Sequence, residues 1–336
     1  MSGEARVLAD LGTLLRRFFV EYLMSQRRVS PCTIAAYRDT FRLLLELIEH
    51  EVGKKPVALR LEDLSAPLVL AFLKHLETER RNSIRTRNAR CAAIRSFMHY
   101  VGLHEPALLA LTQPIVAIPM KRFERPLVGF LTRDHIEALL AAPDPGPWSG
   151  QRDRVMFATL YNTGARVSEL TGMRVADLTL APAAAIRIRG KGRKERCVPL
   201  WRRTARELRG WLKHLPRASD QPLFPNRVGG RLTRTSVAER LKLAAAQAAQ
   251  RYPELAGQPI SPHLVRHSTA MHLLQSGVDV TVIALWLGHE SPATTHTYIE
   301  ADLAMKERAL KALRSPKGAP ARYRPSDRVL ELLQSL

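Results

Sequence analysis

Serine–proline pairs recur in this chain at positions where helices are expected to begin. These helix start signals strongly constrain the fold. Ser30–Pro31, Ser261–Pro262 and Ser291–Pro292 each place a favoured helix N-cap before a residue that suits the first helical turn. After the first pair, apolar residues recur at helical spacing from Ile34 to Ile48, and Gly53 ends the segment. The pairs therefore predict a chain built mainly from helices.

Apolar periodicity predicts further helices on both sides of one short β-hairpin. Before the hairpin, helices are expected over 9–25, from Pro67 to Leu76, over 83–100, after a Thr132 cap and over 152–161. After it, they are expected over 200–214, 233–250, 262–276 and 279–287. Residues 185–198, AIRIRGKGRKERCV, form two short strands around a Gly-Lys-Gly turn with Lys191 at its tip. The expected fold class is α+β, mainly α with a small hairpin or sheet.

Length and proline placement predict two domains and a tail. A chain of 336 residues can bury more than one core. We expect a helical domain over 1–105, an extended basic linker over the proline-containing stretch 106–130, and a mixed domain over 131–314. Residues 315–336 form a Pro-, Gly- and Arg-rich joint followed by an amphipathic tail helix.

The charge balance favours a polyanionic partner. Lysine and arginine number 52 against 31 acidic residues, which gives a formal charge of +21 and a pI of about 10.7. Such an excess favours nucleic acid over the alternatives of a ribosomal or membrane-surface protein. Neither an 18-residue apolar run nor a signal-peptide core is evident, so a soluble cytoplasmic protein is expected. The widely spaced Cys32, Cys91 and Cys197 are expected to be buried thiols.

Residues suited to phosphodiester chemistry are spread over the second half of the chain. Arginines could neutralise the non-bridging oxygens, a phenolate could attack phosphorus, and a lysine or histidine could protonate the departing alcohol. His263 and Arg266 fall one turn apart at a helix N-terminus, and His289 follows the Gly288 cap. The candidate catalytic residues are Arg166, Lys191, His263, Arg266, His289 and Tyr298.

Each of these residues also has an ordinary interpretation. A lone histidine after a cap is more often structural, and a lone tyrosine usually belongs to the core or surface. The combination on a basic chain is what points to DNA. Glu169 shares a helix face with Arg166 and is expected to position structure, while His267 is expected to pack within the domain and His272 to be structural or exposed. Because no carboxylate pair suits two-metal catalysis, no metal and no cofactor are expected.

A second group of arginines lies in the first domain. A helical face carrying them could follow a DNA backbone, or it could be an ordinary solvated face. Acidic partners at neighbouring turns are not evident, which favours DNA. The candidate DNA-binding residues are Arg81, Arg85, Arg87, Arg90 and Arg95.

Four strings in the second half resemble the motifs of the tyrosine recombinases, also called the phage-integrase family. They are TGARVSEL (163–170), GKGRKERCVPL (190–200), HLVRH (263–267) and LGHESPATTHTY (287–298). SPCTIAAYRDTF (30–41) resembles the helical core-binding domain of that family. The resemblance implies a helical core-binding domain followed by a catalytic domain.

The resemblance also implies a role for each candidate residue. Arg166 and Arg266 would clamp the scissile phosphate. His263 would assist proton transfer or hold the phosphate, and His289 would donate a hydrogen bond to a phosphoryl oxygen. Lys191 would be the general acid, with Lys194 as its nearest rival. Tyr298 would attack to give a 3′-phosphotyrosyl link and a free 5′-hydroxyl, and rejoining would need no ATP.

The implied partner is double-stranded DNA with a specific core site, held in a C-shaped clamp. The tail would dock on a neighbouring subunit to form a tetramer on two duplexes, although docking on its own subunit is the alternative. Among recombinases, an integrase or transposase of a mobile element is favoured. A type IB topoisomerase-like enzyme and a catalytically silent DNA-binding regulator remain as alternatives.

Overall fold

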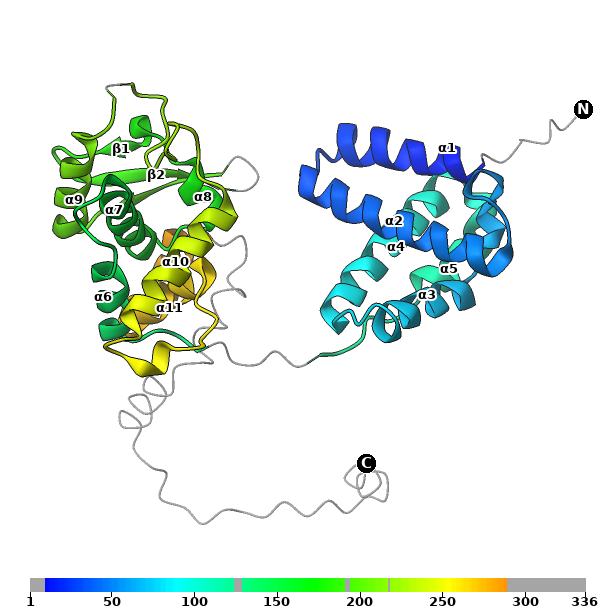
Figure 1. The fold of residues 1–336 in the computed structure, drawn as a ribbon. Coiled ribbons are helices and arrows are strands. Elements are labelled where there is room, and N and C mark those ends of the chain that lie inside the picture. Colours follow the sequence, from blue (N-terminus) through cyan, green and yellow to red (C-terminus); the bar gives the residue numbers. More distant parts are fainter. Residues whose placement is uncertain (1–9, 124–128, 191–193, 217, 289–336) are drawn as a thin grey trace, which may run out of the picture. The chain divides into compact units, whose positions relative to one another are not determined.

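A computed structural model describes residues 10–123, 129–190, 194–216 and 218–288. Its contacts divide the chain into two compact units, Met1–Pro126 and Leu127–Leu336. Within the described residues, no helix has the length and apolar character needed to cross a membrane. Figure 1 shows both units.

The first unit is entirely helical among its described residues. Ser30 caps a helix as expected, and Ser65 and Ser83 are further caps; each side chain accepts a hydrogen bond from the backbone N–H three residues on. Gly53 ends the longest helix with a φ of 70°. The elements are α1 (Leu11–Arg16), the π-helical η1 (Arg17–Gln26), α2 (Pro31–Val52), α3 (Ala66–Thr78), α4 (Ile84–His104) and α5 (Leu109–Val116), with 3-10 turns at Pro56–Ala58, Leu61–Asp63 and Pro106–Leu108.

An aromatic cluster forms the centre of this unit. Phe18 is fully buried and packs edge-on against Phe41 of α2 and Phe97 of α4, with ring centroids 6.3 and 5.3 Å away. Such large buried rings dominate the packing energy of a small core. The cluster therefore joins η1, α2 and α4 into one body.

The expected extended linker over 106–130 is wrong in its first part. Pro106 opens a 3-10 turn and α5 follows, with Thr112 and Ile115 buried. Proline suits the first turn of a helix, and the burial of Leu108, Ile115 and Ile118 in the helical core offsets the cost of Pro114 inside α5. These residues thus belong to the first unit.

The second unit is mixed, and its hairpin forms where it was expected. β2 (Ala185–Arg189) pairs antiparallel with β3 (Glu195–Pro199), and the short β1 (Leu178–Thr179), which was not expected, pairs with the other edge of β2. The helices are α6 (Arg133–Ala141), α7 (Trp148–Thr163), α8 (Val167–Gly172), α9 (Arg202–Leu212), α10 (Arg234–Ala248), α11 (Pro262–Gln275) and α12 (Val280–Leu287), with 3-10 turns at Val175–Asp177 and Pro253–Leu255. The expected mainly α fold with a small sheet is confirmed.

Helices α7 and α11 run through the middle of this unit (Figure 1). Both are buried around most of their circumference, with Met156, Leu160 and Met271 fully enclosed. A helix that is covered on all sides can hold charged side chains only where these find partners. The buried polar residues of α11 therefore need hydrogen-bond partners, and these hydrogen bonds help to fix how α11 packs against its neighbours.

The expectation that all three cysteines are buried is wrong. Cys91 is buried in α4, but Cys32 and Cys197 are exposed. Cys32 lies in the first turn of α2, and Cys197 lies on the outward face of β3, between the inward-facing Arg196 and Val198. Position within the element, rather than residue type, decides their exposure.

Candidate active site

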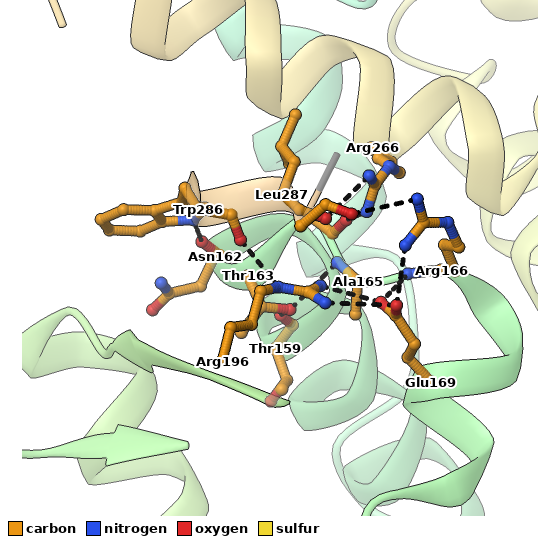
Figure 2. Close-up of polar contacts among 12 residues, drawn as sticks. Thr159, Asn162, Thr163, Ala165, Arg166, Glu169, Arg196, Arg266, Trp286 and Leu287 are labelled. Atoms are coloured by element: carbon orange, nitrogen blue, oxygen red, sulfur yellow. Dashed lines mark hydrogen bonds and ion pairs between the residues drawn. The ribbon is translucent and has the colours of Figure 1, made fainter. Parts of the chain in front are cut away.

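Two arginines from distant segments converge at the C-terminal end of α12. Arg166 donates from Nη2 to the carbonyl of Gly288 at 3.3 Å, and Arg266 donates from Nη2 to the carbonyl of Leu287 at 2.9 Å. Arg266 also donates from Nη1 to the carbonyl of Gly164 at 2.6 Å. The guanidinium groups therefore meet at adjacent carbonyls, directly before His289 in the chain (Figure 2).

Glycine makes this convergence possible. Gly164 ends α7 with a φ of 58°, and a Cβ at this position would lie 2.4 Å from Cδ2 of Leu287. α12 can therefore approach the end of α7 only because residue 164 has no side chain. Gly288 ends α12 in the same left-handed conformation, and cations at a helix C-terminus interact favourably with its last carbonyls.

Glu169 lies beneath Arg166 and binds two guanidinium groups at once. Its carboxylate accepts from Nη1 of Arg166 at 2.9 Å and from both terminal nitrogens of Arg196 at 2.8 and 3.2 Å (Figure 2). Burial acts to raise the pKa of Glu169, but hydrogen bonds from Arg196 and Arg166 outweigh it and hold this pKa below its usual range. These contacts agree with the expectation that Glu169 positions the structure around Arg166.

Arg196 is the residue of this network that the motifs did not single out. It lies on β3 beside the buried Ile188, and its Nε donates to the carbonyl of Trp286 at 2.8 Å. One side chain thus joins the hairpin, α8 and α12. The available signal was its inward position on a strand, where an arginine needs an acidic partner from elsewhere in the fold.

His263 and Arg266 lie on α11 as expected. Ser261 caps this helix by accepting from the N–H of Leu264, so both residues fall in the opening turns. Arg266 is 2% exposed, whereas His263 lies at the surface. Lys194 is exposed at the start of the returning strand, where its carbonyl accepts from the N–H of Gly190 at 2.7 Å.

Three candidate catalytic residues lie outside the described residues: Lys191, His289 and Tyr298. Of the six, the structure describes Arg166, His263 and Arg266, and it brings the two arginines together at the end of α12. Lys191 follows directly from β2 through Gly190, and His289 follows directly from Gly288. In the sequence, Lys191 therefore adjoins the β2–β3 hairpin and His289 adjoins α12, and Arg196 joins the hairpin to α12.

His272 is buried within α11 and takes no part in this cluster. Its Nδ1 lies 2.7 Å from the hydroxyl of Tyr161, and the edge of Phe130 packs against its ring. Burial, with a smaller contribution from the charge of Arg133, lowers the pKa of His272 from 6.5 to about 4. His272 is a neutral structural group at physiological pH, and His267 is likewise buried.

The depressed pKa of His272 predicts acid-sensitive stability. The unfolded chain binds a proton near pH 6.5 and the folded chain only near pH 4, so this contribution is complete above pH 6.5 and is lost as the pH falls toward 4. The free energy of unfolding is expected to fall by about 3 kcal/mol across this window. Thermal unfolding of wild type and His272→Asn between pH 7 and pH 4 measures it, and equal slopes for the two proteins would contradict the assignment.

Arg87 of α4 is buried, although it was expected on an exposed DNA-binding face. This side chain is 4% exposed, lies 3.4 Å from Oε1 of Glu77 through Nε, and donates to the carbonyl of Pro119. Its acidic partner belongs to α3 and not to a neighbouring turn of α4, and Arg87 falls on the inward stripe with Cys91 and Ile94 instead of the expected exposed face. Arg81 and Arg85 are exposed, and Arg90 and Arg95 are half-buried.

Comparisons with known proteins agree with the sequence motifs. Residues 129–305 match the phage integrase family, and residues 17–102 match the N-terminal SAM-like domain of phage integrases. The Sinorhizobium fredii protein y4rC, named as an integrase/recombinase, is 47% identical over 328 residues, covering 98% of this chain and 99% of the relative. Tyrosine recombinase XerC of Pelobacter propionicus is 35% identical over 288 residues, covering 85% and 90%.

A solved structure shares the fold. The XerH site-specific recombinase bound to a palindromic difH substrate superposes with a TM-score of 0.66 at 22% identity, covering 85% of this chain and 81% of that chain. Fold, motifs and relatives together define a site-specific DNA recombinase of the tyrosine class. The chain belongs to the phage integrase family.

Proposed function

We propose that this recombinase cuts and rejoins DNA through a covalent bond between Tyr298 and a 3′-phosphate. The phenol oxygen attacks phosphorus, the bond from phosphorus to the 5′-oxygen breaks, and that oxygen leaves with a proton as a 5′-hydroxyl. A 5′-hydroxyl from another strand then reverses the step. The observation that carries this proposal is the convergence of Arg166 and Arg266 on the carbonyls of Gly288 and Leu287, at the end of the helix that His289 follows in the sequence.

Each side chain has a role in this scheme. Arg166 and Arg266 bind the non-bridging oxygens, a task that suits the forked guanidinium. His263 assists proton transfer or holds the phosphate, and His289 donates a hydrogen bond to a phosphoryl oxygen. Lys191 protonates the leaving oxygen, with Lys194 as its nearest rival. Covalent trapping of DNA on the wild-type protein tests the scheme.

Arg196 and Glu169 act as positioning residues. The hydrogen bonds of Arg196 to Glu169 and to the carbonyl of Trp286 fix β3 relative to α8 and α12. β3 belongs to the hairpin that carries Lys191, α8 begins after Arg166, and α12 precedes His289. This network would therefore fix the positions of Lys191, the two clamp arginines and His289 relative to the phosphate.

The DNA partner is a duplex with a specific core site, contacted in the first unit by Arg81, Arg85, Arg90 and Arg95. Arg90 supports this role, because burial and the nearby charge of Arg80 lower its pKa and its Nη1 reaches only the hydroxyl of Thr40 at 3.4 Å among the described residues. A phosphate beside it would favour its charged form. Arg87 serves instead to hold the chain at Pro119.

A type IB topoisomerase would share this chemistry but would act on one duplex. The relatives named as recombinases favour strand exchange, and the 47% identical relative supports the integrase type, which we assign to a mobile element acting in the cytoplasm. Relaxation of a supercoiled plasmid that lacks a target site separates the two activities. Efficient relaxation of such a plasmid would favour the topoisomerase.

Strand exchange between two duplexes requires an oligomer, and we assign its contact to the tail. The tail over 315–336 lies outside the described residues, but its sequence ends in an apolar stripe from Val329 to Leu336 that needs a covering surface. Deleting 326–336 is expected to preserve binding to one site and to lower the pairing of two sites at least tenfold. Gel-shift and recombination assays measure the two steps, and full recombination by the truncated protein would contradict the assignment.

A further inference from the structure

A small cavity next to Glu169, the partner of Arg166, is lined by four arginine side chains. It has a volume of about 210 Å³ and lies where α8, the 3-10 turn at Val175–Asp177 and β2 meet. Its charged lining residues are Arg174, Arg187, Arg189, Arg231, Asp177 and Glu169. Four cations thus face two carboxylates.

The carboxylates are already occupied. Asp177 is 4% exposed and lies 3.4 Å from Nη2 of Arg187 and 3.2 Å from Nη2 of Arg189. Glu169 binds Arg166 and Arg196, neither of which lines the cavity. Positive charge therefore exceeds negative charge around the cavity, and an anion within it would relieve the repulsion.

The guanidinium groups of two of these arginines have no acidic partner among the described residues, although the backbone N–H of Arg174 donates to Asp177. Of the side chains described, no carboxylate lies within 4.0 Å of the guanidinium groups of Arg174 or Arg231, although Arg189 also pairs with Glu195 at 3.2 Å. Arginine side chains that line a hollow without a carboxylate are suited to bind a phosphate, which accepts two parallel N–H bonds from a guanidinium.

The location of the cavity indicates which phosphate it binds. Glu169 lines the cavity and also holds Arg166 of the clamp, while Arg189 leads through Gly190 to Lys191. Successive phosphates of one strand advance by about 3.4 Å along the helix axis. We propose that this cavity binds a backbone phosphate of the bound duplex close to the cleaved phosphate, an inference whose location rests on the clamp proposed above.

Salt dependence of DNA binding tests the site independently of cleavage. The full chain, the cavity variant Arg174→Gln/Arg231→Gln and the control Arg202→Gln/Arg206→Gln are titrated with one random-sequence duplex at several salt concentrations. The control removes the same charge from exposed positions on α9 that do not line the cavity. The cavity variant is expected to lower the magnitude of the slope of log K against log salt by about 1 relative to the control, because the cavity binds one phosphate.

Equal slopes for the cavity variant and the control would overturn the proposal. Because Arg174 is half-buried, Arg231→Gln alone, at an exposed position, repeats the comparison with Arg206→Gln if the double variant unfolds at a lower temperature. A slope change of about 1 is expected for this single variant as well.

Neutral methylphosphonate links then locate the phosphate. They are placed one at a time in a duplex carrying a site that the protein selects from a random pool. One link within a few nucleotides of the cleaved position is expected to weaken binding by wild type and to have no effect on the cavity variant. If the sensitive link lies far from the cleaved position, the cavity binds DNA but the assigned position beside the clamp is wrong, whereas loss of cleavage alone bears only on the function proposed above.

Discussion

Tyr298→Phe is expected to abolish covalent capture of DNA while leaving DNA binding unchanged. Phenylalanine keeps the ring but removes the oxygen that forms the bond to phosphorus. The substrate is a duplex bearing a site selected by the protein, nicked so that the fragment with the 5′-hydroxyl is lost after cleavage. A protein–DNA band that resists denaturant then reports the covalent product.

Wild type provides the positive control and Tyr161→Phe the matched negative control. Tyr161 is the hydrogen-bond partner of His272, away from the arginine cluster, so its hydroxyl is not expected to matter for capture. Loss of the band in Tyr298→Phe, together with its persistence in Tyr161→Phe, is the expected pattern. Persistence of the band in Tyr298→Phe would remove Tyr298 as the nucleophile.

Arg266→Ala is expected to slow cleavage by at least 10² to 10³-fold, the usual effect of removing one preorganised charge donor. Nonspecific binding should change little, because the chain carries a formal charge of +21. Arg266→Lys is expected to recover little activity, since an ammonium group cannot form the two parallel bonds of a guanidinium. Single-turnover cleavage on the nicked duplex measures all three proteins.

Stability must be measured alongside, because Arg266 is 2% exposed and its removal leaves the buried carbonyls of Gly164 and Leu287 without this donor. Arg166→Ala gives an independent comparison, since the Arg166 side chain is 39% exposed and costs less to remove. Arg196→Gln should give a smaller loss than either, because it acts through position. Cleavage near the wild-type rate in folded Arg166→Ala would contradict the clamp.

Local signals in the sequence predicted most of the fold. Caps such as Ser30, Ser83 and Ser261 act within one helical turn, so the residues themselves specify where helices begin. The Gly-Lys-Gly sequence likewise falls between β2 and β3 in the chain. The order and spacing of the motifs then identified the family. Several motifs in the same order are much less likely to agree by chance than any single residue.

Features that depend on distant contacts were not predictable. α5 forms because Ile115 packs in a core that the prolines around it do not reveal. Arg87 is buried because Glu77 and Pro119 lie beside it, and Arg196 turns inward because Glu169 and Trp286 meet it there. Each partner is separated from its arginine by many residues or by a turn of the chain. Periodicity alone carries no information about such pairs.

Identification of the modified residue in trapped complexes tests the central claim most directly. Covalent complexes are digested with trypsin and a nuclease, and the peptide that carries the remaining nucleotide is sequenced by mass spectrometry. The expected result is a nucleotide on Tyr298, in the peptide that begins after Arg266 and contains His289. A nucleotide attached to any other residue would show that the arginine clamp at α12 does not serve this tyrosine.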